Sequence, residues 1–208
     1  MILGAVKLKE GVYWVGAVDW NLRDFHDFHT VRGTTYNSYL IMDEKKVLVD
    51  TVKSEFSEDL IDNIKDLIDP NKLDYVIVNH VEPDHSGSIK AIMGLAKNAK
   101  IVCTEKGRDG LKKYYGGDWE CIIAKMGMEL KLGKKTVKFI EAPMLHWPDS
   151  MFTYIEEDKV LLPNDAFGQH IATSKRFDDE NGEEIMDEAA KYFANILMPF
   201  SSLILRAA

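Results

Sequence analysis

The stretch Asn79–Gly87 carries four potential metal ligands within six consecutive residues. It follows the apolar, β-branched run Tyr75–Val78, which predicts a buried strand. The residues that come after it, 86–96, have the pattern of a helix with Ser86 as its N-cap. In α/β sheets, ligands usually bind at the carboxyl ends of the strands. The sequence therefore predicts a fold that contains such a sheet, with a metal site at its edge.

The four potential ligands in this stretch are His80, Glu82, Asp84 and His85. In an extended segment, side chains two residues apart point the same way, so we expect His80, Glu82 and Asp84 to share a face. Pro83 is expected to keep Glu82 extended and to delay the helix, after which His85 turns away. Single histidines and acids near strand ends are commonly solvated loop residues or helix caps, but this spacing favours ligation. So short a loop suits two adjacent metal ions better than one.

The bulk composition excludes several classes of function. The chain has 208 residues, enough for one domain with a substantial core. Its net charge of −8 and its lack of a Lys/Arg cluster argue against nucleic-acid binding. We find no signal peptide, and no apolar run approaches the roughly 20 residues that span a bilayer. Two cysteines, Cys103 and Cys121, fit a reducing compartment, so we expect a cytoplasmic protein without a nucleic-acid or membrane partner.

The order of predicted elements changes along the chain. Strands and turns come first, with single strands expected at 12–18 and 34–42, and an irregular aromatic segment at 19–33 is expected to pack over another part of the molecule. Helices then alternate with strands, strands return, and an amphipathic helix is expected at 183–197. Its inward face is expected to carry Ile185, Met186, Ala189, Tyr192, Phe193 and Ile196. A two-sheet α/β (α+β) sandwich flanked by helices fits this order better than a doubly wound sheet.

Two later residues, His146 and Asp165, can complete the metal site because each follows the end of a predicted strand. Asp165 would then lie close to Glu82 and Asp84. Three buried carboxylates without partners would be too costly and would take up protons instead. Two divalent cations contribute +4 against the −3 of these carboxylates. The charge balance therefore supports a two-metal site, in which a carboxylate such as Asp165 can bridge the two ions.

Five stretches together resemble the metallo-β-lactamase-like domain of the flavodiiron proteins. They are Asp19–His26, Gly33–Asn37, His80–Gly87, Leu145–Met151 and Asn164–Gln169. The resemblance runs through nearly the whole chain and implies an αββα metallo-β-lactamase-like sandwich over residues 1–208. The family also carries a C-terminal flavodoxin-like domain that binds FMN, and no phosphate-binding loop of that kind occurs here. We therefore expect the chain to be the metal domain alone, truncated at its C-terminus.

The resemblance also implies roles for individual residues. The implied ligands are His80, Glu82 and His146 for one iron, Asp84 and His85 for the other, and Asp165 as the bridge. His26 and Tyr192 are implied as catalytic residues near the open coordination positions. The last histidine ligand of the family lies beyond the matched segment, and none of the six histidines follows His170. We expect a structural role for His170.

Glu82 bears on the choice of metal and reaction. Hydrolases with this fold typically read H-x-H-x-D-H and favour zinc, whereas here a carboxylate replaces the second histidine and favours a harder metal. We expect two iron ions, with zinc able to substitute, and FMN on the missing domain. The resemblance implies reduction of O2 to water, of NO to N2O, or of both, with rubredoxin or a reduced deazaflavin as electron donor and a head-to-tail homodimer at full length. The alternatives are a binuclear zinc metallohydrolase and an inactive fragment.

Overall fold

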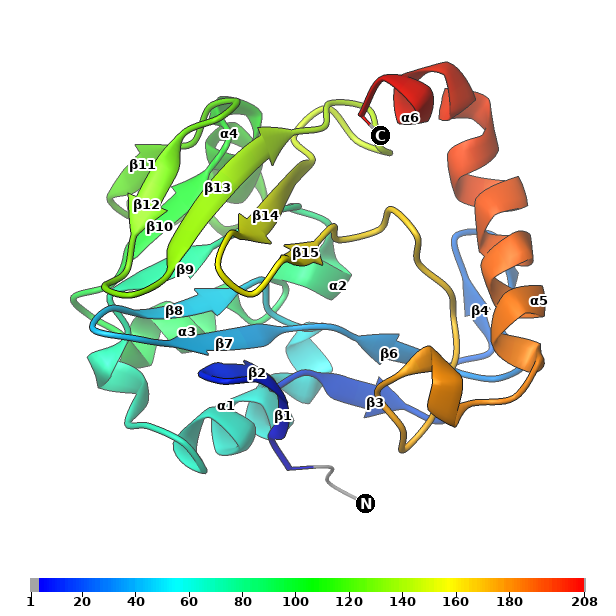
Figure 1. Cartoon of the computed structure of the whole chain (residues 1–208), viewed down its shortest axis with the longest axis horizontal. Coiled ribbons are helices and arrows are strands. Elements are labelled where there is room, and N and C mark those ends of the chain that lie inside the picture. Colours follow the sequence, from blue (N-terminus) through cyan, green and yellow to red (C-terminus); the bar gives the residue numbers. More distant parts are fainter. Residues whose placement is uncertain (1–3, 208) are drawn as a thin grey trace.

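Two stacked β-sheets form the centre of the computed structural model, which describes residues 4–207 (Figure 1). The larger sheet contains, in spatial order, β1 (Val6–Lys9), β2 (Val12–Trp14), β7 (Tyr39–Met42), β8 (Lys46–Val49), β9 (Tyr75–Ile77), β10 (Lys100–Cys103) and β11 (Cys121–Ile123). The smaller sheet contains β12 (Glu129–Lys131), β13 (Thr136–Glu141), β14 (Met151–Ile155) and β15 (Val160–Leu162). Strands β8 to β11 pair in parallel, so the segments that follow β8, β9 and β10 leave the sheet at one edge.

Alternating side chains of the larger sheet pack into two separate cores. Val76 faces a core shared with helices, whereas its neighbour Ile77 faces the smaller sheet and packs with Phe139. The helices of the first core are α1 (Ser57–Lys65), α3 (Ile89–Leu95) and α4 (Glu105–Tyr115). Because successive side chains of a strand point to opposite faces, a strand buried on both faces reads as a continuous apolar run. This explains why Tyr75–Val78 is apolar throughout.

The last helices lie at one end of the sandwich, where α6 (Ser201–Ala207) packs against the outer face of the smaller sheet (Figure 1). α5 (Glu184–Tyr192) continues as a π-helical turn, η4 (Phe193–Leu197), and then as the 3₁₀ turn η5 (Met198–Phe200) and α6. Ile204 of α6 packs in a cluster with Ile140 and Phe152 of the sheet. Helices thus flank both sheets, and the predicted αββα sandwich is confirmed. None of the helices within residues 4–207 is long and apolar enough to cross a membrane.

The expected inward face of the 183–197 helix is partly wrong. Tyr192 is buried, but Met186 is 70% exposed and Phe193 is 43% exposed. The helix stands at one end of the sandwich rather than within it (Figure 1), so only a narrow stripe of its surface is covered. Periodicity predicted the helix but overestimated the width of its buried face.

Two strands that were expected to be single are each divided. Residues 12–18 form β2 and β3 (Ala17–Asp19), and residues 34–42 form β6 (Thr34–Tyr36) and β7. β3 pairs with β6 in a separate ribbon. Between β2 and β3, Gly16 lies so close to the opposite chain that a Cβ there would be 2.0 Å from the Tyr36 carbonyl oxygen. This close approach permits the change of sheet, and it cannot be read from the apolar pattern.

The segment after β9 becomes helical earlier than expected. α2 (Pro83–Ser86) begins at Pro83 with Glu82 as its N-cap residue, and Ser88, rather than Ser86, precedes α3. Proline is well suited to the first helical position, because its missing N–H has no partner there and its φ is already helical. The restriction that proline imposes applies to the residue before it, which is Glu82. Asp84 and His85 therefore lie on a helical turn, not on an extended strand.

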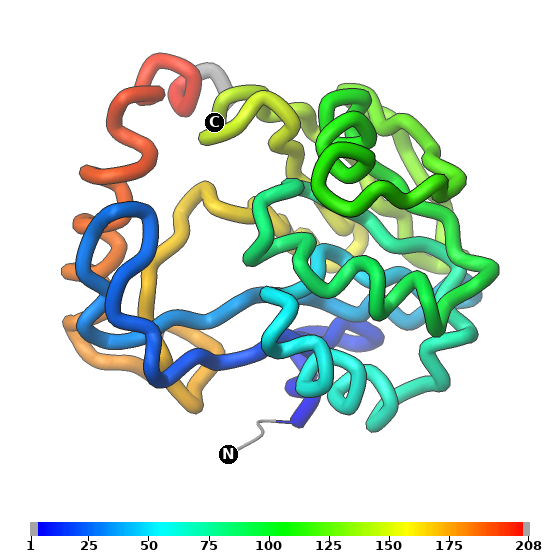
Figure 2. Tube along the Cα trace, turned by 180° about the vertical axis from the view of Figure 1, so that it is seen from behind, coloured from blue at the N-terminus to red at the C-terminus, as the bar shows by residue number. Residues whose placement is uncertain are grey.

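The aromatic segment 19–33 forms a two-stranded hairpin. Its strands are β4 (Asp24–Phe25) and β5 (Phe28–His29), joined by His26 and Asp27, which both have positive φ. Figure 2 shows this hairpin beside α5, as does Figure 1. The remaining short elements of the chain are η1 (Ser54–Phe56), η2 (Pro70–Lys72) and η3 (Asp178–Glu180).

Candidate metal centre

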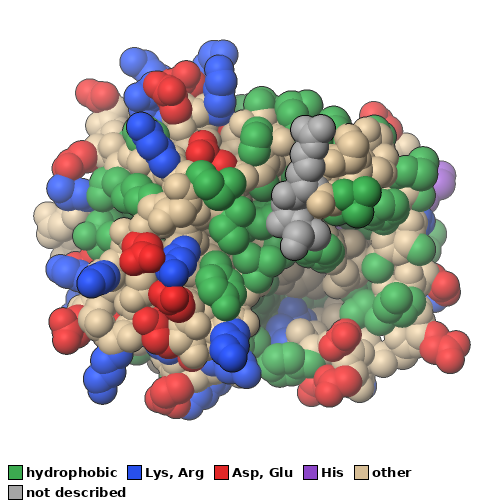
Figure 3. Space-filling view, turned by 45° about the horizontal axis from the view of Figure 1, so that its top comes forward, with side chains coloured by type: hydrophobic (Ala, Val, Ile, Leu, Met, Phe, Trp, Pro, Cys, Tyr) green, Lys and Arg blue, Asp and Glu red, His purple; other side chains and the backbone are tan. Residues whose placement is uncertain are grey.

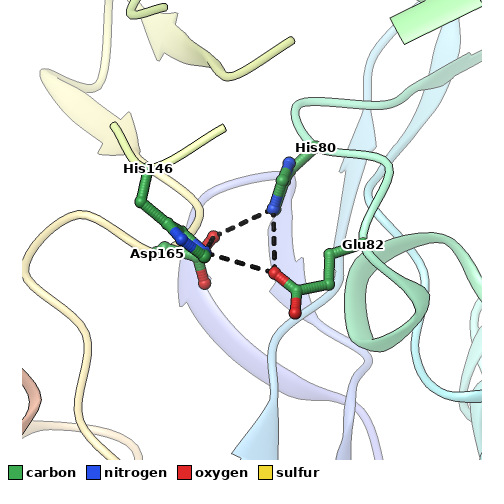
Figure 4. A group of neighbouring side chains, drawn as sticks. All are labelled: His80, Glu82, His146 and Asp165. Atoms are coloured by element: carbon green, nitrogen blue, oxygen red, sulfur yellow. Dashed lines mark hydrogen bonds and ion pairs between the residues drawn. The ribbon is translucent and has the colours of Figure 1, made fainter. Parts of the chain in front are cut away.

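Six side chains from four segments meet at the edge where β9 ends. His80 and Glu82 follow β9, Asp84 and His85 lie on α2, His146 follows β13 and Asp165 follows β15. Figure 4 shows four of them, His80, Glu82, His146 and Asp165, pointing toward one another. The expectation that ligand candidates converge from separate strand ends is therefore met by their positions.

The first group of donor atoms comprises His80, Glu82, His146 and Asp165. Their ligand atoms all lie within 4.8 Å of one another. Glu82 Oε2 is 3.2 Å from Nε2 of both His80 and His146. Asp165 Oδ2 is 3.3 Å from His80 Nε2 and 3.5 Å from His146 Nε2. Two imidazoles and two carboxylates thus surround one point, as four ligands surround a single ion.

The second group comprises Asp84, His85 and Asp165, again within 4.8 Å of one another. His85 Nε2 lies 3.1 Å from Asp165 Oδ1 and 3.5 Å from Asp84 Oδ2. Asp165 therefore directs Oδ2 toward the first group and Oδ1 toward the second. Asp84 does not share a face with His80 and Glu82, contrary to expectation, because α2 turns it toward His85. The helical turn separates the ligand candidates into two groups.

The burial and the partners of the carboxylate oxygens show whether cations fit this cluster. Asp84 and Asp165 are 9% and 5% exposed. Among the described residues, Asp84 Oδ1 has no hydrogen-bond partner, and Asp165 Oδ2 has only its ion pairs with His80 and His146. Burial raises the pKa of Asp84, and the neighbouring carboxylates Asp165 and Glu82 raise it further. Unpartnered buried anions are costly unless they are paired or coordinate metals. Two divalent cations would satisfy these oxygens, so the residues fit a dinuclear site.

Histidine protonation reflects the same surplus of negative charge. Burial lowers the pKa of His80, but hydrogen bonds with Asp149 and Glu82 outweigh it and raise the pKa to about 10. Burial also opposes charge on His146, yet Asp165 and Glu82 raise its pKa to about 9. With protons as the only cations, both rings are charged at neutral pH. A metal ion would replace these protons.

Two further carboxylates, which the sequence analysis missed, lie beside the histidines, and one of them, Asp149, orients His80. Asp149 Oδ2 accepts a hydrogen bond from His80 Nδ1 at 3.0 Å and another from the Val81 N–H at 2.8 Å. Asp50 Oδ2 lies 3.7 Å from His85 Nδ1. A carboxylate on one ring nitrogen leaves the other nitrogen free for a metal. Asp149 lies within the Leu145–Met151 stretch, and its closeness to His146 in the sequence could have predicted its place at the site. For Asp50, the only sequence feature that pointed to the site was its position after a strand.

Both residues expected to be catalytic reach this cluster. His26 Nε2 lies 3.0 Å from Glu82 Oε1, at the tip of the β4–β5 hairpin. The hydroxyl of Tyr192 donates a hydrogen bond of 2.9 Å to Asp165 Oδ1. The expectation that the 19–33 segment packs over another part of the molecule is thus confirmed, since it covers the cluster. His170 joins neither donor group and hydrogen-bonds Thr34 Oγ1 at 2.9 Å through Nδ1.

A sequence profile described as the ODP family beta lactamase matches residues 34–207. A nitric oxide reductase from Moorella thermoacetica is 60% identical over 203 residues, which cover 96% of this chain and 51% of that protein. The flavodiiron protein of Giardia intestinalis superposes on the chain with a TM-score of 0.96 at 44% identity, over 100% of this chain and 51% of that one. The chain belongs to the flavodiiron family. The expected resemblance to its metallo-β-lactamase-like domain is confirmed.

Other members of the flavodiiron family agree in sequence and in structure. An anaerobic nitric oxide reductase flavorubredoxin from Pectobacterium carotovorum is 44% identical over 205 residues, 96% of this chain and 41% of that protein. The rubredoxin oxygen:oxidoreductase of Desulfovibrio gigas superposes with a TM-score of 0.95 at 42% identity, over 98% of this chain and 51% of that one. The chain spans about half the length of the relatives it matches.

Proposed function

We propose that this flavodiiron domain holds two iron ions and forms the catalytic part of an oxidoreductase that reduces NO, O2 or both. The bridging geometry of Asp165 is the observation that carries the proposal, because its two oxygens face two separate donor groups. In this proposal His80, Glu82 and His146 hold one ion, Asp84 and His85 hold the other, and Asp165 is shared. The carboxylate of Glu82, in place of a neutral imidazole, favours iron over zinc.

Two side chains outside the proposed ligand set, His26 and Tyr192, contact the ligand candidates. When bound, two ferrous ions supply two electrons and a Lewis-acidic surface for a diatomic gas. His26, on Glu82 Oε1, closes one side of the cluster and positions a ring N–H there. Burial and the carboxylate of Asp165 raise the pKa of Tyr192 well above its ordinary value, so its hydroxyl stays protonated and donates its hydrogen bond to Asp165. These two groups hydrogen-bond the ligand candidates Glu82 and Asp165 from outside the two donor groups.

Electrons must come from outside this domain. The names of two relatives include rubredoxin or flavorubredoxin, which supports a rubredoxin-type donor, with a reduced deazaflavin as the other candidate. We propose that FMN on a flavodoxin-like domain of the full-length protein passes the electrons on, in a head-to-tail homodimer. The family and the Glu82 ligand both weigh against the zinc hydrolase alternative.

The full-length protein tests this proposal. Purified without oxygen and loaded with ferrous iron, it should retain two irons per chain and consume NO or O2 when a rubredoxin-type donor is supplied. Asp165→Asn should lose at least one iron and the activity, whereas Asp118→Asn, at an exposed loop position, should lose neither. Stable zinc binding with hydrolysis of ester or phosphodiester substrates, and no gas consumption, would contradict the proposal.

A further inference from the structure

Two imidazole nitrogens beside the metal centre are buried and have no hydrogen-bond partner among residues 4–207. They are Nδ1 of His26 and Nε2 of His170. The other nitrogen of each ring is held, since His26 Nε2 lies 3.0 Å from Glu82 Oε1 and His170 Nδ1 lies 2.9 Å from Thr34 Oγ1. Buried polar atoms of native proteins nearly all have a hydrogen-bond partner. Two unpartnered nitrogens in one region therefore indicate a further contact between the groups that carry them.

The rings of His26 and His170 are neighbours in the fold, although they are distant in the sequence. Their centroids are 5.5 Å apart, and their planes meet at 44°. The structure has no hydrogen bond between the two rings. At this separation, rotation of one ring can bring facing nitrogens within hydrogen-bond reach, about 3 Å. A small movement of one side chain would thus give both nitrogens a partner.

The surroundings of His170 offer its unpartnered nitrogen few alternatives. His170 is 5% exposed, and the face of the molecule drawn in Figure 3 shows histidine at one edge only. Aromatic rings surround it, with centroids 5.2 Å away for Phe25 and Tyr192 and 5.5 Å away for Phe28. The phenylalanines carry no polar atom on their side chains, and the Tyr192 hydroxyl already donates to a ligand candidate. Because both unpartnered nitrogens are buried, a partner has to come from within this cluster of rings, to which His26 also belongs.

Donors and acceptors match in such a pair. Burial and the neighbouring imidazole of His26 lower the pKa of His170 to about 4, so its ring carries one proton at neutral pH. A neutral imidazole has one N–H donor and one acceptor nitrogen, and a hydroxyl group can donate or accept. If His26 Nδ1 accepts, the proton of His170 lies on Nε2 and Thr34 donates to Nδ1; if His26 Nδ1 donates, that proton lies on Nδ1 and Thr34 accepts. The chain of contacts from Thr34 to Glu82 is therefore complete in either direction.

We propose that His170 is a positioning residue, which hydrogen-bonds His26 and so holds the His26 ring against Glu82. The contact ties the tip of the β4–β5 hairpin to β6, the strand that carries Thr34. The effect of His170 on gas reduction rests on the proposed function, whereas the hydrogen bond itself does not.

The distance between the two nitrogens tests the pair without turnover and without any variant. A crystal structure of the full-length protein loaded with zinc should place His26 Nδ1 about 3 Å from His170 Nε2. Nitrogens that remain apart, or a different partner on either of them, overturn the proposal.

Hydrogen exchange of the hairpin tests whether the nitrogens of His170, rather than its bulk, hold His26. His170→Phe retains a ring and removes both nitrogens, whereas His170→Gln retains an amide that can donate or accept near the position of Nε2. In the full-length protein, followed by mass spectrometry, exchange of residues 24–29 should be about tenfold faster in His170→Phe and close to unchanged in His170→Gln. Thr30→Val is the control, because it removes a fully buried hydroxyl without a partner from the same segment, and it should leave the exchange unchanged. Equally fast exchange in the Gln and Phe variants would show that His170 acts by packing alone, which overturns the proposal.

A double-mutant cycle tests whether His170 acts through His26. His170→Phe should lower gas reduction by the ferrous-loaded full-length protein roughly tenfold, because misplacement of a group beside the reacting atoms slows the reaction, and two irons per chain should be retained. It should cause no further loss when His26→Ala is already present. An unchanged rate in His170→Phe, or the same further loss in both backgrounds, overturns the positioning role. A full-length protein that shows the paired nitrogens but reduces neither NO nor O2 leaves the hydrogen bond standing and removes the proposed function instead, so the two failures are distinguishable.

Discussion

The hydroxyl of Tyr192 lies 2.9 Å from Asp165 Oδ1, the oxygen that is also 3.1 Å from His85 Nε2. Tyr192 thus holds the bridging carboxylate on the side of the second donor group. Tyr192→Phe removes this hydrogen bond and retains the ring. We expect the ion held by Asp84 and His85 to bind about tenfold more weakly, the lower end of the usual effect of removing a partner of a ligand. Competition with a chelator measures it, and Tyr114→Phe, at a half-exposed position, is the control.

Replacing Asp149 should weaken metal binding, although Asp149 belongs to neither donor group. Asp149→Asn replaces the carboxylate that fixes His80 with Nδ1 protonated, and the amide can rotate to present a donor instead. We expect metal affinity to fall by roughly 10- to 100-fold while the secondary structure, measured by circular dichroism, is unchanged. An affinity equal to that of the unchanged protein would show that His80 is oriented by packing alone.

Metal affinity should rise with pH. The pKa values of His80, about 10, and His146, about 9, mean that a metal ion must displace two protons at neutral pH. A group whose pKa is raised on folding stabilises the fold below its unfolded value and loses that contribution as pH rises through the folded value. Chelator-treated protein should therefore lose stability progressively as the pH rises from 6.5, the ordinary histidine value, to about 10. The rise in melting temperature caused by added metal should be larger at pH 9 than at pH 6, as measured by differential scanning fluorimetry.

His26 should affect turnover but not metal content. It contacts Glu82 Oε1 but belongs to neither donor group. His26→Ala should leave two metals per chain and lower gas reduction by the full-length protein. His29→Ala, on the same hairpin with its ring 84% exposed, should change neither quantity. Loss of one metal from the His26 variant would instead make His26 part of the metal site.

Phe139 links the two sheets, since it is fully buried in the core between them. Phe139→Ala should lower the free energy of unfolding by about 3–5 kcal/mol, through lost burial and the cavity left behind. Leu205→Ala, at a position that is 81% exposed, should lower it by less than about 0.5 kcal/mol. Urea denaturation of both variants gives the comparison.

Local patterns in the sequence predicted that the ligand candidates converge, but not how they divide into two groups. The spacing from His80 to His85 predicted a metal-binding stretch, and the places of His146 and Asp165 after strands indicated convergence. The division into two groups depends on Pro83, which begins α2 and turns Asp84 toward His85. Extended geometry was the wrong assumption there, because proline suits a helix start as well as an extended link.

Local sequence patterns could not predict contacts between residues that are distant in the sequence. Asp149 is 69 residues from His80, and the hydrogen bond between them exists because the loop after β13 packs against the end of β9. Met186 and Phe193 were expected inside because their spacing is helical, but the surface available at the end of the sandwich covers only part of α5.

The sequence alone determined the two-sheet order, the family and the ligand candidates, because apolar periodicity and short-range spacing are properties of neighbouring residues. Tertiary structure decided which donor atoms share a centre and which carboxylates support them. These depend on how separate segments pack, and the distances between segments are set by the whole fold rather than by any one stretch of it.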